Sequence, residues 1–228
     1  MEKLGTNYGG WIIPKNMNLH EDSIIYSGGV GEDISFDIKL QTKYGCNIIL
    51  IDPTEKAKKH FIENKLYYSS NKQHKFKGNI QNDYYAQIQN ENPNFNKFMY
   101  VNKGLWNTKT TLKFYKQSNP DYVSQSLING MFSTNYDVVD VDSIKNIMSD
   151  LSHNRIDLLK LDIEGAENIV LEQMLDDNIY PKYVCIEFDL ILKRKDPDNT
   201  TKKIINRMLK EGYTIFVNDN MNITFEYV

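Results

Sequence analysis

The sequence predicts a doubly wound α/β fold, with a mostly parallel seven-stranded sheet that ends in a C-terminal antiparallel hairpin. Three observations lead to this prediction. Short apolar runs rich in β-branched residues alternate with segments of helical periodicity. A glycine-rich loop follows the first apolar run, and two strand-like runs close the chain.

The apolar runs have the length and composition of buried strands. They are Ser23–Tyr26, Ile48–Ile51, Phe98–Val101, Ile156–Leu161 and Tyr183–Phe188. Because helical segments separate most of them, we expect parallel strands with helices on both faces of the sheet. Thr111–Tyr115 alternates in polarity and is interpreted as a small accessory strand.

The C-terminal region has a different pattern. A predicted helix at Thr200–Glu211 is followed by two strand-like runs, Tyr213–Val217 and Ile223–Val228, with a turn-rich segment between them. Two strands joined by so short a segment must pair antiparallel, since a parallel pair would need a long crossover.

The length of 228 residues suits one domain covering the whole chain, 1–228. A polar stretch at about 66–97 follows a predicted helix at Thr54–Lys65. We interpret it as a surface insertion in preference to a substrate lid.

Composition excludes several classes of protein. The net charge is −3 and lysines are mixed with acids, so the basic stripe of a nucleic-acid binder is missing. No stretch is long and apolar enough for a membrane span, and no targeting segment is recognised, so a cytoplasmic location is expected. Cys46 and Cys185 lie in apolar strands and are interpreted as core residues. The oligomeric state is left open.

A nucleotide site is predicted where the first strand ends. The loop contains Ser27, Gly28, Gly29, Gly31 and Glu32 and leads into a helix. Glycines allow a sharp turn and a close approach of the backbone to a ligand.

The second strand ends in Asp52 and Pro53, where an acid can hold the hydroxyls of a ribose. Trp106, after the third strand, is expected near the adenine, either stacked on it or in the core.

The loop favours S-adenosylmethionine (SAM) over a dinucleotide. A dinucleotide fingerprint needs a third glycine beyond Gly31, but Glu32 and Asp33 follow instead. Two carboxylates would repel a pyrophosphate, whereas the ammonium and sulfonium of SAM are cationic.

Three blocks together resemble the FkbM-type methyltransferases: Tyr26–Asp37, Ile51–Thr54 and Ile156–Glu167. The resemblance implies a Rossmann-like class I methyltransferase that uses SAM to methylate hydroxyls of glycans or small molecules. One departure is Ser27, which stands where many class I members keep an acid. The hold on the methionine end would then pass to Glu32, Asp33 or another group.

Carboxylates at the carboxyl ends of the fourth and fifth strands are the candidate catalytic groups, namely Asp162, Glu164, Glu187 and Asp189. One of them would take the proton of the acceptor hydroxyl, or Asp162 and Glu187 would bind a divalent metal, and spacing does not decide between these roles. His153 and His74 are the next candidate bases. Glu167 is expected to cap a helix.

Two alternative functions remain open at this stage. The glycines and Asp52 also suit a nicotinamide-dependent oxidoreductase, although Asp33 and the terminal hairpin disfavour it. The other alternative is a catalytically inactive binding module that keeps the SAM fold.

Overall fold

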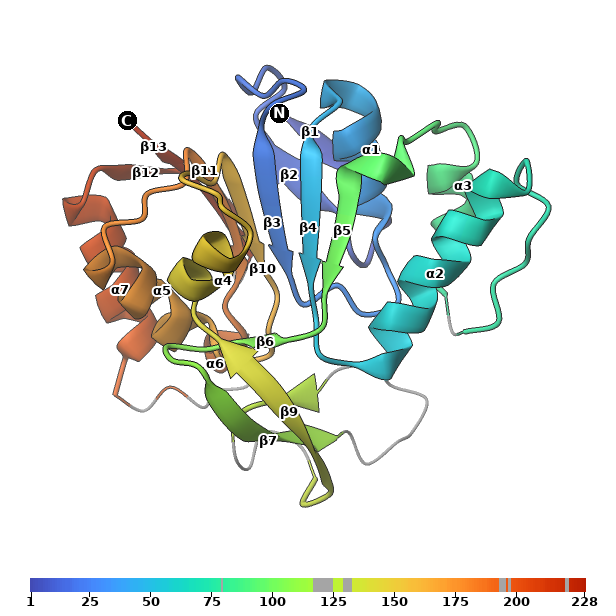
Figure 1. The fold of residues 1–228 in the computed structure, drawn as a ribbon. Helices are drawn as coiled ribbons and strands as arrows, with labels where there is room; N and C mark the ends of the chain where they lie inside the picture. The colour runs from blue at the N-terminus through green and yellow to red at the C-terminus, as the bar shows by residue number, and fades with distance from the viewer. Residues whose placement is uncertain (79, 117–124, 129–132, 193–195, 197, 220–221) are drawn as a thin grey trace.

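A seven-stranded mixed sheet forms the centre of the molecule (Figure 1). The computed structural model describes residues 1–228 except 79, 117–124, 129–132, 193–195, 197 and 220–221. The strand order is β12-β13-β11-β10-β3-β4-β5. In chain order the strands are β3 (Ile24–Gly28), β4 (Asn47–Ile51), β5 (Phe98–Val101), β10 (Leu158–Leu161), β11 (Tyr183–Glu187), β12 (Tyr213–Asp219) and β13 (Asn222–Tyr227).

The prediction of a mostly parallel sheet is confirmed for the five strands β5, β4, β3, β10 and β11, in which all neighbours pair parallel. β13 then pairs antiparallel with β11, and β12 pairs antiparallel with β13. The two residues that join β12 to β13, 220 and 221, lie outside the described part of the chain.

Helices cover both faces of this sheet. One face packs against α1 (Ser35–Tyr44), α2 (Glu55–Ser69) and α3 (Tyr84–Ile88), and the other against α4 (Ile144–Asp150), α5 (Glu167–Asp176) and α7 (Thr200–Lys210). Side chains along a strand alternate between the two cores, as period-two geometry requires. In β3, for example, Ile25 belongs to the first core and Tyr26 to the second.

A second sheet of four strands lies beyond the carboxyl ends of the central strands (Figure 1). Its order is β6 (Gly104–Leu105), β9 (Tyr136–Asp142), β7 (Thr110–Lys116) and β8 (Gln125–Ser126). The predicted accessory strand at Thr111–Tyr115 is confirmed as part of β7. β9, which pairs antiparallel with β7, was not expected from the sequence.

The N-terminus forms a two-stranded antiparallel sheet from β1 (Glu2–Leu4) and β2 (Trp11–Ile13). Residues 5–10 connect these strands. Two short elements complete the description: the 3₁₀ helix η1 (Phe95–Lys97) and α6 (Asp189–Leu192). No helix in the described ranges is both long and apolar enough to cross a bilayer.

The stretch predicted as a surface insertion, 66–97, is buried in part. Tyr84 and Ile88 are fully buried in the first core. The Tyr84 hydroxyl donates to Asn64 Oδ1 at 3.0 Å and lies 3.0 Å from His60 Nε2. Burial lowers the pKa of His60 to about 3, so this imidazole is neutral. The stretch therefore contributes side chains to the core.

Candidate active site

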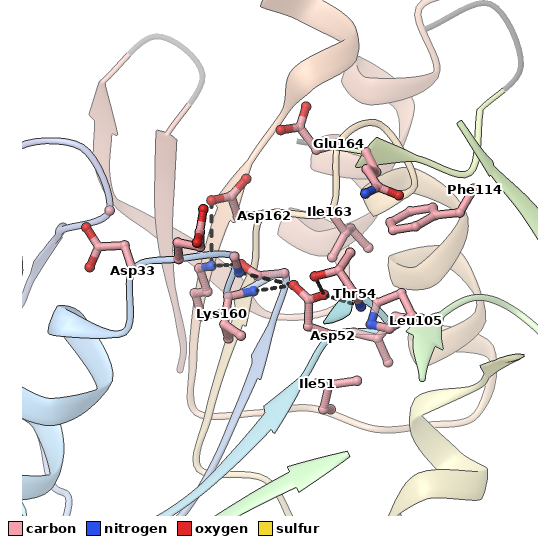
Figure 2. Close-up of a pocket in the computed structure, with 18 of the residues that line it drawn as sticks. Asp33, Ile51, Asp52, Thr54, Leu105, Phe114, Lys160, Asp162, Ile163 and Glu164 are labelled. Atoms are coloured by element: carbon pink, nitrogen blue, oxygen red, sulfur yellow. Dashed lines mark hydrogen bonds and ion pairs between the residues drawn. The ribbon is translucent and has the colours of Figure 1, made fainter. Parts of the chain in front are cut away.

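A pocket of about 880 Å³, including its open mouth, lies beyond the carboxyl ends of β3, β4 and β10 (Figure 2). Its size suits a ligand as large as a nucleoside with a substituent. The walls come from the loop after β3, the end of β4, the second sheet and residues 160–164, together with Tyr8, Gly9 and Gln81.

The loop after β3 needs glycine for two reasons. Gly29 and Gly31 have φ angles of 69° and 50°, in the left-handed region that favours glycine. A Cβ at Gly29 would also overlap the backbone carbonyl of Asp162. The loop after β3 and the loop after β10 are therefore in direct backbone contact.

Asp52 fixes the glycine loop through hydrogen bonds to its backbone. It is 5% exposed, and its Oδ2 accepts hydrogen bonds from the backbone N–H of Val30 (3.0 Å) and Gly31 (3.1 Å). Its Oδ1 accepts from the N–H and the hydroxyl of Thr54, at 2.8 and 2.7 Å. Thr54 in turn caps α2 by accepting from the N–H of Ala57. The acid at the end of β4 thus fixes the floor of the pocket.

Lys160 is a functional candidate that sequence reasoning missed. It lies within the apolar strand β10, is only 6% exposed, and lines the pocket. Its Nζ donates to the carbonyl oxygens of Gly28 and Gly29 and lies 3.6 Å from Asp162 Oδ2. The signal was available, because a lysine inside a buried apolar run needs nearby oxygen partners.

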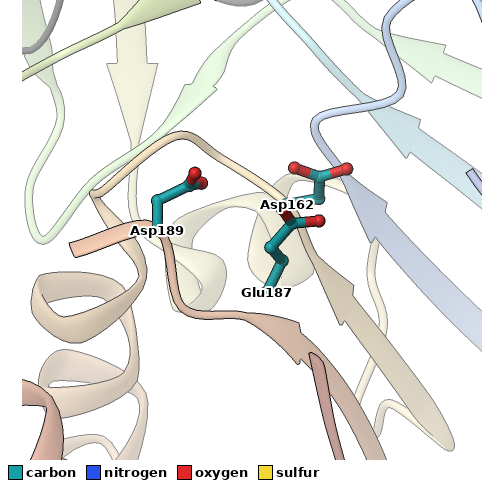
Figure 3. A group of neighbouring side chains, drawn as sticks. All are labelled: Asp162, Glu187 and Asp189. Atoms are coloured by element: carbon teal, nitrogen blue, oxygen red, sulfur yellow. The ribbon is translucent and has the colours of Figure 1, made fainter. Parts of the chain in front are cut away.

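A carboxylate cluster adjoins the pocket at the ends of β10 and β11 (Figure 3). Oxygen atoms of Asp162, Glu187 and Asp189 lie within 4.8 Å of one another. Burial and the neighbouring charge of Asp162 raise the pKa of Glu187 to about 8. Carboxylates so close together can share a proton or hold a hard cation through oxygen. These three are the side chains of the described chain that offer such a site.

Comparison with protein families gives one result. The model of the "Methyltransferase FkbM domain" matches residues 26–215. The chain belongs to the FkbM methyltransferase family. The match covers the glycine loop, Asp52, Lys160 and the carboxylate cluster. No curated protein and no solved structure matches the chain. A methyltransferase family gives no support to the alternative of a nicotinamide-dependent oxidoreductase.

Within this FkbM domain the predicted cofactor residues divide into two groups. Those that line the pocket are Gly29, Gly31, Glu32, Asp52 and Pro53. Ser27, Gly28 and Trp106 are not among the lining residues.

The reason is local geometry in each case. Ser27 is fully buried within β3, and a Cβ at Gly28 would lie 2.6 Å from the side chain of Leu105. Trp106 follows β6, and its neighbour Leu105 forms the wall in its place.

The predicted acids at the ends of β10 and β11 differ in role. Asp162 and Glu164 line the pocket, and Glu187 and Asp189 join Asp162 from the adjacent strand end. Glu167 Oε1 accepts from the backbone N–H of Ile163 and of Gly165, both at 3.0 Å. Glu167 therefore stabilises the loop in front of α5, but it does not cap the helix as expected, because α5 has no side-chain cap hydrogen bond.

Neither candidate histidine base lies at the pocket. His153 Nδ1 lies 2.9 Å from the hydroxyl of Tyr26, in the second core. His74 lies 4.0 Å from Glu63, beside α2. We therefore do not expect either histidine to act as the base.

The chemistry of the pocket wall fits a cationic cofactor. Its described lining includes the carboxylates of Glu32, Asp33, Asp52, Asp162 and Glu164. Lys160 is the one cationic side chain among the lining residues of the described chain, and its ammonium is already engaged by carbonyls. The sulfonium and ammonium of SAM suit this wall, whereas a pyrophosphate would be repelled.

Proposed function

We propose that this FkbM domain is a SAM-dependent O-methyltransferase acting on a hydroxyl of a sugar, a glycan or a small molecule. The observation that carries the proposal is the acidic pocket beyond the carboxyl ends of β3, β4 and β10, with Asp162 on its wall. Ligands of open α/β sheets bind at this edge.

The residues present divide the work of holding SAM. The glycine loop allows close approach of the ligand, and Asp52 keeps that loop in shape while facing the ribose. Pro53, Leu105 and Ile163 offer apolar surface for the adenine. Since each Asp52 oxygen already accepts two hydrogen bonds, a ribose hydroxyl has to displace one of these donors to be held by Asp52.

The carboxylate cluster supplies the acid–base chemistry. When bound, SAM provides a methyl group whose carbon–sulfur bond breaks as the acceptor oxygen bonds to the carbon. Asp162 accepts the proton of that hydroxyl, and Lys160 stabilises the negative charge of Asp162. Glu187 is mostly protonated at neutral pH, because its pKa is raised to about 8, and it can donate a hydrogen bond to the acceptor.

A divalent metal held by the same carboxylates is the alternative way to activate the hydroxyl. It would orient the acceptor and lower the pKa of its hydroxyl. The two routes use the same residues but differ in their response to chelation.

Ligand binding followed by methyl transfer tests the proposal. We expect SAM and S-adenosylhomocysteine (SAH) to raise the melting temperature in scanning fluorimetry, and NAD to leave it unchanged. Label from methyl-labelled SAM should then pass to a member of a panel of sugars and hydroxylated small molecules. Binding of NAD without SAH would refute the proposal, and SAH binding without transfer to any acceptor would favour an inactive binding module.

A further inference from the structure

The connection between β1 and β2 lies over the acidic side of the pocket, and we refer to residues 5–10 as the N-terminal strap. Thr6, fully buried, anchors it: its hydroxyl donates to Asp33 Oδ2 at 2.5 Å and accepts from the N–H of Gly9 at 2.8 Å. The N–H of Thr6 donates to Ser35 Oγ at 2.9 Å. The strap is thus tied to the start of α1.

Close packing and a second anchor hold the strap in place. A Cβ at Gly9 would lie 2.8 Å from Asp33 Cγ, so the backbone there lies directly against this carboxylate. The N–H of Asn7 donates to Asp83 Oδ2 at 2.9 Å, which joins the strap to the segment before α3. Tyr8 and Gly9 then line the pocket, with Tyr8 63% exposed at its mouth.

The pocket has two chemically different ends. Glu32, Asp33 and the strap form an acidic end, while Leu105, Phe114 and Ile163 belong to an apolar end. Figure 2 shows Asp33 on the opposite side of the pocket from Leu105 and Phe114, with Asp52 between them.

SAM has a matching polarity, with a flat apolar adenine at one end and an amino acid with an ammonium group at the other. With the adenine at the apolar end of the pocket, the amino-acid end of SAM lies at the acidic end, beneath the strap. A tyrosine ring attracts an ammonium group through its π face, and a carboxylate does so by charge.

We infer that the N-terminal strap binds the amino-acid end of SAM, with Tyr8 and the Gly9 backbone as its wall and with Thr6 and Asp33 fixing the strap in place. This inference rests on the proposed function. It assigns to the strap the role that Ser27, buried beneath the pocket, does not fill.

Two ligands that differ only in this end test the inference. SAH carries the amino-acid end, and 5′-methylthioadenosine has the same thioether and nucleoside without it. Calorimetry on the full chain should give a lower Kd for SAH than for methylthioadenosine. In Tyr8→Ala we expect the SAH affinity to fall about tenfold and the methylthioadenosine affinity to change less than about twofold.

Three further variants sharpen the result. Tyr8→Phe keeps the ring and should retain the wild-type ratio of SAH affinity to methylthioadenosine affinity. Thr6→Val removes the hydroxyl at nearly constant volume and should lower the ratio as Tyr8→Ala does. Tyr136→Ala is the matched control, because Tyr136 is also exposed but lies on β9 and is not a lining residue.

An unchanged ratio in Tyr8→Ala, with tight SAH binding in all variants, would overturn the role of the strap and leave the proposed function standing. Wild-type protein that binds neither ligand would overturn the proposed function itself. Because Tyr8 is exposed, its replacement tests the inference even if Thr6→Val does not fold.

Discussion

The Oδ2 atom of Asp52 accepts a hydrogen bond of 3.1 Å from the backbone N–H of Gly31. The end of β4 therefore holds the loop that follows β3. An acid in this position is usually considered for its contact with a ribose. Here the same carboxylate also satisfies backbone donors in a buried turn, so ligand binding and loop stability depend on one side chain.

Replacing Asp52 with Asn tests this double role. An amide offers one acceptor oxygen in place of two, so an NH₂ group must face either the N–H groups of Val30 and Gly31 or the donors of Thr54. We expect a loss of about 1–3 kcal/mol in the free energy of unfolding, together with weaker SAH binding. Urea denaturation and calorimetry measure the two effects. Asp140→Asn, at an exposed position on β9, is the control, and equal stability of Asp52→Asn and this control would contradict the prediction.

Lys160→Met tests the contact between the two loops. The variant keeps most of the volume but removes the donor to the carbonyls of Gly28 and Gly29 and the positive charge beside Asp162. We expect a loss of about 1–3 kcal/mol in the free energy of unfolding and weaker SAH binding, because the carbonyl of Gly29 loses the Lys160 donor, whereas that of Gly28 keeps the N–H of Asp162.

The buried Asp37 gives a second readout for this variant. Burial raises the pKa of Asp37 to about 6, and the charge of Lys160 opposes that rise. Loss of Lys160 should therefore raise the pKa of Asp37 further, which NMR titration of its carboxyl carbon would detect. An unchanged titration, with unchanged SAH binding, would show that Lys160 does not couple the loops.

The central sheet could be predicted because its strands are short apolar runs that face helices on both sides, so each run is hydrophobic throughout. The glycine loop and Asp52 could also be predicted. Positive φ angles require glycines at fixed positions, and an acid directly after an apolar run marks the end of a strand. Lys160 and Asp162 are two residues apart, so period-two geometry places them on the same face of the sheet. Only the structure shows that Lys160 lies against the carbonyls of the glycine loop.

The rest depended on long-range contacts that leave little local pattern. Tyr84 and Ile88 lie in a polar stretch, and their burial depends on α1 and α2. The contacts that anchor the strap could not be derived, because Thr6 and Asp33 are far apart in sequence. The ring of Trp106 made it the candidate from the sequence, yet Leu105 lines the pocket, because the pairing of β6 with β9 sets the direction of neighbouring side chains.

Tyr84→Phe tests the core role of the stretch at 66–97. The variant removes the hydroxyl that meets Asn64 and His60, and leaves buried polar atoms without this partner. We expect a loss of about 1–3 kcal/mol in the free energy of unfolding by urea denaturation. Tyr136→Phe, on the exposed side of β9, is the control. A stability equal to that of the control would show that the Tyr84 hydroxyl does not stabilise this part of the core.

Glu187 should make stability depend on pH. Its pKa is raised to about 8 from 4.5, so between these values the folded protein holds a proton that the unfolded chain releases. The wild type therefore loses stability as pH rises from about 4.5 to 8, and Glu187→Gln avoids this loss.

We expect the variant to melt at a higher temperature than the wild type at pH 8, with the difference shrinking toward zero near pH 4.5. Thermal unfolding across this range measures it. Glu21→Gln, at an exposed position, reports the effect of removing a surface carboxylate. A difference that grows as the pH falls would reverse the sign and refute the assignment.

Asp162→Asn separates the two routes by which the carboxylate cluster could activate an acceptor hydroxyl. Asp162 lines the pocket beside Gly29, whereas its neighbour Glu187 holds a proton at neutral pH. If Asp162 takes the proton, the variant should lose at least about a hundredfold in turnover while its SAH affinity stays within about threefold. Chelation of the wild type should then have no effect. If the cluster holds a metal, chelation should abolish turnover in the wild type and an added divalent ion should restore it. Turnover of Asp162→Asn close to that of the wild type, with no effect of chelation, would remove Asp162 from the mechanism and direct attention to Glu164 on the same wall.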